Sequence, residues 1–170
     1  MKCLILILII LLIHLILSNY PKYSFSLNSY TSFKYLETYP ILFILLEYEL
    51  YDYALLFIIF YWISDIDFRI QEIPDLSHLL ILIYFYNQIS FDLFNLFIII
   101  ILSFFSYIGY IGFGDIKLLL TIALIYSNNL INIMFIASLL CLIINFNKKD
   151  AKISFAPYIC IATLLTITFQ

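Results

Sequence analysis

The sequence has little charge and very little glycine. Charged residues make up 11% of its 170 residues, whereas apolar residues make up 65%. Because a soluble globular domain carries about a quarter charged residues, this composition excludes a surface that faces water throughout. The net charge of −3 carries little information, and no basic patch indicates a nucleic-acid partner. The composition predicts an all-α, polytopic membrane protein embedded in the lipid bilayer.

The sequence also lacks the motifs of metal, serine and nucleotide chemistry. Its three cysteines are far apart and form no CxxC pair, so they predict neither a zinc site nor a disulfide framework. The motifs HExxH and GxSxG and the P-loop are absent as well. We therefore expect no metal and no cofactor.

Eight apolar runs follow one another along the chain. A spanning helix needs about 20 apolar residues, and several of these runs are shorter. We predict eight transmembrane helices in a single membrane-embedded domain over residues 1–170, in which 1–38 form the first span and a short cytoplasmic loop and about 40–170 form the functional core. The runs cover residues 3–17, 40–46, 53–64, 79–86, 93–111, 116–126, 130–146 and 157–169.

The positive charges gather on one side of this predicted topology. Seven of the eight Lys and Arg residues lie in the loops 18–38, 65–78, 112–117 and 147–152. The loops on the opposite side hold acidic residues and no cation, and Lys2 near the start of the chain is the one exception. By the positive-inside rule, the four basic loops face the cytoplasm. We expect the protein to lie in the cell (inner) membrane.

The few glycines of the sequence lie together beside one acidic residue. Average usage of about 7% predicts roughly twelve glycines, but the chain has three, at positions 109, 112 and 114, just before Asp115. Glycine permits close approach of backbones and positive φ, so we expect Gly112 and Gly114 to shape the backbone beside this carboxylate. An aspartate within a membrane protein is a functional-site hypothesis. A simple loop end rich in turn residues is the alternative.

A second carboxylate is expected to meet Asp115. Asp65 and Asp67 follow the run 53–64, and two predicted spans separate them from Asp115, so the chain returns to the same membrane face. Two carboxylates held close share a proton, and one then acts as a base on water while the other acts as an acid. This pattern predicts peptide hydrolysis without a metal, with the carboxylates within roughly 9 Å of each other. The competing interpretation of residues 65–78 is a solvated cytoplasmic loop.

Three segments, in order, resemble the motifs of the type IV prepilin peptidases, which are membrane aspartic peptidases. They are IDFRIQEIPD (66–75), GFGDIKLLL (112–120) and ISFAPYICIA (153–162). In that family the catalytic aspartates lie seven residues before the proline of Ile-Pro and within GxGDxKLL. The resemblance therefore implies that Asp67 and Asp115 are catalytic.

The same motifs imply supporting residues. Pro74 and Pro157 occupy the prolines of the first and third motifs, and Ala156 replaces the usual glycine of the third. Lys117 is expected to anchor the loop or to meet anionic headgroups.

The resemblance implies an endopeptidase that cuts the short basic leader from type IV prepilin-like membrane proteins at the cytoplasmic face, in pilus assembly or protein secretion. Bacterial members usually carry a cytoplasmic domain with two CxxC pairs, which this sequence lacks, so N-methyltransferase activity is not expected. Three alternatives remain open. They are a presenilin-like protease, a small transporter or assembly protein whose intramembrane acids carry protons or ions, and an inactive family member.

Overall fold

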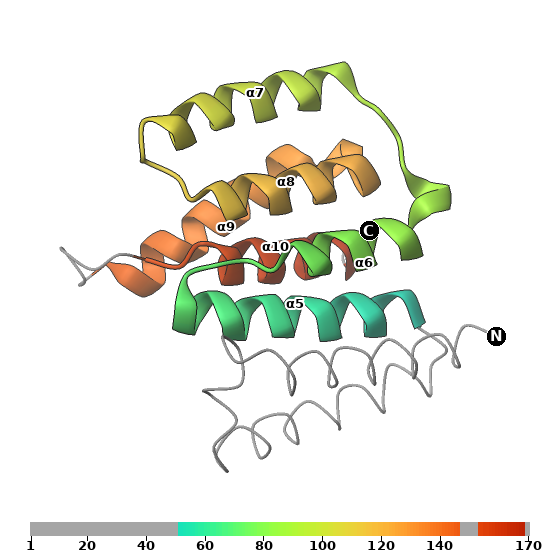
Figure 1. Ribbon diagram of the computed structural model, residues 1–170, viewed down its shortest axis with the longest axis horizontal. Helices are drawn as coiled ribbons and strands as arrows, with labels where there is room; N and C mark the ends of the chain where they lie inside the picture. Colours follow the sequence, from blue (N-terminus) through green and yellow to red (C-terminus); the bar gives the residue numbers. More distant parts are fainter. Residues whose placement is uncertain (1–50, 147–152, 169–170) are drawn as a thin grey trace, which may run out of the picture. The chain divides into compact units, whose positions relative to one another are not determined.

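The computed structural model describes residues 51–146 and 153–168, and all regular structure in these ranges is helical (Figure 1). The all-α prediction is therefore confirmed for the described residues, while the predicted runs 3–17 and 40–46 lie outside them. Short 3₁₀ turns, η1 (Tyr86–Gln88) and η2 (Ser127–Asn129), lie in two of the connections. The described α-helices are α5 (Tyr51–Ile70), α6 (Asp75–Tyr84), α7 (Leu93–Tyr107), α8 (Phe113–Ile125), α9 (Leu130–Asn145) and α10 (Ala156–Thr168).

The chain divides into two compact units, Met1–Ile58 and Ile59–Gln170, with the division inside α5. The second unit holds every candidate site residue. Its central helix is α8, which contacts α6, α7, α9 and α10. Leu118, Leu119 and Ile122 of α8 are buried. The first turn of α8 is thereby held in a fixed place by its neighbours.

Short connections make consecutive helices of the second unit run in opposite directions (Figure 1). The C-terminal end of α5 and the N-terminal ends of α6, α8 and α10 consequently lie at one end of the unit. We call this the polar end, and it comprises residues 64–75, 112–117 and 153–157. Asp67, in the last turns of α5, and Asp115, in the first turn of α8, both belong to it.

Gly109 ends α7 before the chain turns toward α8. Its φ is 93°, a left-handed conformation that glycine adopts without steric cost. The N–H of Gly109 donates to the carbonyl of Ser106 at 2.9 Å, and the N–H of Tyr110 donates to the carbonyl of Phe105 at 3.1 Å. These two bonds form a Schellman motif, which satisfies the last carbonyls of the helix.

The acidic segment 65–78 is less of a loop than the sequence predicted. Helix α5 continues through Asp65 and Asp67 to Ile70, and α6 begins at Asp75, so only residues 71–74 are non-helical. Gln71 ends α5 with a φ of 57°, and its N–H donates to the carbonyl of Asp67 at 2.9 Å. The charged side chains therefore lie on helix ends, where their directions are fixed.

Span length supports the membrane prediction only in part. Among the described residues, the single helical stretch Ser127–Asn145 is long and apolar enough to cross a membrane. Helices α6, α7 and α10 are apolar but shorter, with 10, 15 and 13 residues. Because a helix rises about 1.5 Å per residue, 15 residues reach about 22 Å of a hydrocarbon core about 30 Å thick. The described helices thus do not support a count of eight spans.

A buried hydrogen bond joins α9 to α10. Asn145, the last residue of α9, donates from Nδ2 to the hydroxyl oxygen of Tyr158 at 2.7 Å, and both residues are buried. The same Nδ2 donates to the carbonyl of Cys141 at 3.0 Å. This bond fixes the start of α10 against the end of α9.

We predict that Tyr158→Phe lowers the free energy of unfolding by about 1 kcal/mol, since it removes the acceptor from a buried amide. The measurement is the denaturant midpoint of the detergent-solubilised protein. Tyr107→Phe is the matched control, because Tyr107 is 90% exposed. Equal midpoints for the two variants would contradict the prediction.

Candidate active site

Asp67 lies in the last turns of α5 with a buried side chain. Its backbone carbonyl accepts hydrogen bonds from the N–H of Gln71 and from the hydroxyl of Ser154, the latter at 2.9 Å. Asp65 is half-buried two residues earlier in the same helix. Because each residue of a helix turns about 100°, the two aspartates point to different sides of α5.

Asp115 lies in the first turn of α8, and its carboxyl group meets three parts of the chain. It accepts hydrogen bonds from the backbone N–H groups of Gly112 and Ala156, and the charge of Asp67 acts on it. Helices α5 and α8 therefore place the two acids predicted from the sequence close enough for their charges to interact. The start of α10 contributes a backbone hydrogen bond to Asp115.

The ionisation of Asp115 is coupled to this environment. Asp115 belongs to residues 112–117, which the sequence places between spans. Burial, followed by the repulsion from Asp67, raises the pKa of Asp115 to about 7, while the N–H groups of Gly112 and Ala156 oppose that rise. Two like carboxyl groups in such an arrangement favour a state with one shared proton. This is the state that acid–base hydrolysis of a peptide bond requires.

Gly112 and Gly114 serve the site by leaving space. A Cβ atom on Gly112 would lie 2.9 Å from Oδ2 of Asp115, and one on Gly114 would lie 3.2 Å from Cγ1 of Ile73. Gly112 has a φ of −65°, which other residues adopt readily. The backbone conformation therefore does not require glycine at 112, and the close carboxylate of Asp115 is what disfavours a side chain there. Positive φ is found at Gly109 instead. At Gly112 and Gly114 the structure therefore shows close approach of neighbouring atoms, without a positive φ.

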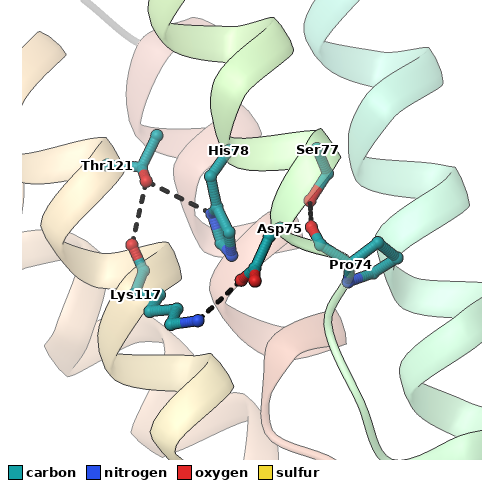
Figure 2. Close-up of polar contacts among 6 residues, drawn as sticks. All are labelled: Pro74, Asp75, Ser77, His78, Lys117 and Thr121. Atoms are coloured by element: carbon teal, nitrogen blue, oxygen red, sulfur yellow. Dashed lines mark hydrogen bonds and ion pairs between the residues drawn. The ribbon is translucent and has the colours of Figure 1, made fainter.

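The start of α6 is tied to α8 by an ion pair between Lys117 and Asp75, which Figure 2 shows. Nζ of Lys117 donates to Oδ1 of Asp75 at 2.6 Å and lies 5.2 Å from the ring centroid of Phe113. The Lys117 ammonium holds the pKa of Asp75 below its ordinary value. An exposed pair of this kind adds little stability, so its effect is to orient the start of α6. Lys117 thus contacts the first residue of α6, directly after the connection 71–74.

Pro74 and Pro157 both stand at helix starts. Pro74 precedes α6 in an extended conformation, and its carbonyl accepts from the N–H and the hydroxyl of Ser77 at 3.0 and 2.6 Å (Figure 2). Pro157 is buried in the first turn of α10. A proline there costs no helical hydrogen bond and fixes φ for the helix. Both prolines therefore stiffen segments that adjoin the acids.

Polar contacts between α6 and α8 were not predicted from the sequence. The hydroxyl of Thr121 donates to the carbonyl of Lys117 at 2.9 Å, and its oxygen lies 3.2 Å from Nδ1 of the buried His78 (Figure 2). Because the hydroxyl proton is already engaged, Nδ1 of His78 is the donor to Thr121. No local sequence pattern links positions 78 and 121.

Sequence reasoning also missed two residues near the acids. The buried thiol of Cys160 interacts with Ser64 and feels the charges of Asp67 and Asp115. Cys160 lies four residues after Ala156, on the same face of α10, and this spacing is a signal that could have found it. The second missed residue is Ser154, whose hydroxyl bonds α5.

The sequence matches no protein-family model, no curated protein and no solved structure at a significant level. The resemblance to prepilin peptidases therefore rests on the three sequence motifs alone. Within residues 51–146 and 153–168, no group of three or more His, Cys, Asp or Glu residues is placed to hold a metal ion.

We predict that Gly114→Ala lowers the free energy of unfolding by about 1–3 kcal/mol, because the added methyl group overpacks against Ile73. In an Ile73→Ala background the methyl group has room, so the same substitution should have a much smaller effect. The measurement is a double-mutant cycle of denaturant midpoints. An equal cost of Gly114→Ala in both backgrounds would show that Ile73 is not the constraint.

Proposed function

We propose that this chain is a membrane-embedded aspartic endopeptidase that removes the leader of type IV prepilin-like precursors at the cytoplasmic face of the cell membrane. Asp67 and Asp115 are its catalytic residues, and no metal takes part. Residues 1–170 contain no CxxC pair, and the proposal is therefore cleavage without methylation of the new N-terminus. Pilus assembly or protein secretion supplies the substrates.

The observation that carries this proposal is the mutual influence of two carboxyl groups from different helices. Asp67 and Asp115 act on each other electrostatically at the polar end, although 48 positions separate them in the sequence (115 − 67). Backbone donors from Gly112 and Ala156 orient one of the two groups. Such an arrangement lowers the free energy of unfolding and is typical of catalytic carboxyl pairs.

The proposed reaction uses one water molecule and one proton held by the pair. The carboxylate of Asp67 takes a proton from water while the water oxygen attacks the peptide carbonyl carbon. The carboxyl of Asp115 gives its proton to the carbonyl oxygen, so that a tetrahedral diol forms. Proton transfer to the amide nitrogen and cleavage of the C–N bond then release the leader and restore the pair.

The membrane part of the proposal rests on the surfaces of α7 and α9. Large apolar side chains with more than half of their surface exposed line both helices, and a lipid environment favours such a surface where water does not. Eight spans remain part of the proposal, supported by the order of the apolar runs and not by helix length. The exposed side chains are Leu93, Phe94, Phe97, Ile100 and Phe104 on α7 and Ile131, Phe135, Leu142, Ile143 and Ile144 on α9.

The rival proposal of a transporter receives less support. Acids that carry ions across a membrane are expected near its midplane and in a pathway. Asp67 and Asp115 instead occur at helix ends, beside the basic Lys117 and the exposed Asp75. This placement favours chemistry on a segment that approaches from the cytoplasm.

We predict that Asp67→Asn and Asp115→Asn each reduce cleavage by roughly a hundredfold or more, since each removes a proton-transfer group. The double variant should be no worse, because the pair acts as a unit. The substrate is a tagged precursor with a short Lys/Arg-rich leader that ends in glycine before an apolar helix. Leader loss is followed by immunoblot, and mass spectrometry reads the new N-terminus.

Asp65→Asn is the matched control for this prediction, and it should keep most of the activity because Asp65 points away from the pair. Membrane levels of all variants are compared with an epitope tag. If Asp65 proves essential and Asp67 dispensable, the assignment of the pair is wrong. If the wild-type protein leaves the precursor intact, the proposed function is wrong.

The rate of cleavage is predicted to depend on pH in a definite direction. The active pair carries one proton, and the pKa of Asp115 is about 7. Above that pH the proton is lost, so kcat/KM should fall about tenfold for each further pH unit. The measurement is kcat/KM in liposomes between about pH 6 and pH 9. A constant kcat/KM across this range would exclude Asp115 as the proton donor.

A further inference from the structure

The residues at the start of α10 and just before it, 153–156, form hydrogen bonds to both acids. The hydroxyl of Ser154 donates to the backbone carbonyl of Asp67 at 2.9 Å, and the N–H of Ala156 donates to the carboxyl of Asp115. The two donors are two residues apart, and an extended chain covers at most about 7 Å over that distance. The connection therefore limits the separation between the end of α5 and the carboxyl of Asp115.

The anchor at Ala156 is stiff. Ala156 and Pro157 are buried, and the carbonyl of Phe155 accepts from the N–H groups of Tyr158 and Ile159 at 3.1 and 3.3 Å. The first N–H groups of a helix have no partner within it, and α10 gives one of them to Asp115. The positive end of the α10 dipole also favours a carboxylate at this place.

The anchor at Ser154 is the weaker of the two. Its side chain is half-buried, and its hydroxyl donates to the carbonyl of Asp67 in α5. Loss of this hydroxyl would remove a bond between α5 and the connection before α10, whereas the bond from Gln71 to the same carbonyl lies within the end of α5 itself.

We infer that Ser154 and Ala156 are positioning residues that hold the two aspartates at a fixed separation, with Ser154 setting α5 and Ala156 orienting the carboxyl of Asp115. The inference rests on the proposed peptidase function. Neither residue exchanges a proton with substrate. Their contribution is the geometry in which Asp67 and Asp115 share one water molecule.

The test compares Ser154→Ala, Ser154→Thr and Ser103→Ala with the tagged precursor as substrate. Ser154→Ala should lower kcat roughly fivefold, the value of one hydrogen bond, with KM unchanged. Ser154→Thr keeps the hydroxyl and should restore kcat. Ser103 donates to a carbonyl within its own helix α7, at 2.8 Å, so Ser103→Ala should match the wild type. If Ser154→Ala protein does not accumulate, Ser154→Cys, a weak donor, takes its place.

A second readout does not depend on cleavage. The infrared band of the protonated Asp115 carboxyl is obtained as the difference between wild type and Asp115→Asn at about pH 6, below the pKa of about 7. In Ser154→Ala this band should move, because α5 shifts and the charge of Asp67 then acts on the Asp115 carboxyl from a different distance. The band in Ser154→Thr should stay at the wild-type position.

The outcomes separate this inference from the proposed function. A lower kcat together with a shifted band, both restored by threonine, supports positioning by Ser154. An unchanged band, or a kcat in Ser154→Ala equal to that of the wild type, overturns it. If the wild-type protein does not cleave the precursor, the proposed function fails, and the infrared band alone decides whether Ser154 positions Asp67 relative to Asp115.

Discussion

The burial of two neighbouring carboxyl groups is the constraint on which the polar end depends. Burial, and after it the charge of Asp67, raises the pKa of Asp115, because both disfavour the ionised form. Backbone N–H groups from Gly112 and Ala156 oppose part of that rise. Asp115 therefore keeps a proton near neutral pH, where an isolated aspartate would have lost it. In the proposed peptidase this protonated carboxyl group is the proton donor.

Close packing around Asp115 explains where this sequence uses its few glycines. A side chain at 112 would collide with the carboxylate, and one at 114 would press on Ile73. The absence of these two Cβ atoms lets the connection 71–74 lie against the first turn of α8, where Lys117 bonds Asp75. Glycine elsewhere would only weaken the apolar helices. Gly112 and Gly114 thus reflect one crowded contact between the first turn of α8, its own carboxylate and the connection 71–74, whereas Gly109 allows the turn after α7.

The start of α10 gives the third motif a physical role. Ala156 is fully buried, and its N–H bonds Asp115, so alanine at this position is compatible with the contact that the carboxylate requires. The buried Cys160 follows on the same face, beside Ser64 and near both acids. Three segments that are distant in the sequence thereby surround one pair of carboxyl groups. This convergence at helix ends is what the proposed hydrolysis by a shared water would require.

The sequence by itself determined the helices and the approximate location of the acids. Apolar runs predicted the described helices to within about four residues of their ends, except that α5 continues six residues beyond the predicted run 53–64, since burial or lipid contact acts on contiguous side chains. The larger errors fell in the segment 65–78, because charge indicates solvent and does not show that α5 continues through Asp67. Only the tertiary structure decided which aspartate faces Asp115, why Gly112 must lack a side chain, and that Ser154 and Ala156 bond the acids. Each of these depends on atoms from helices far apart in the chain, and no local pattern of residues records such contacts.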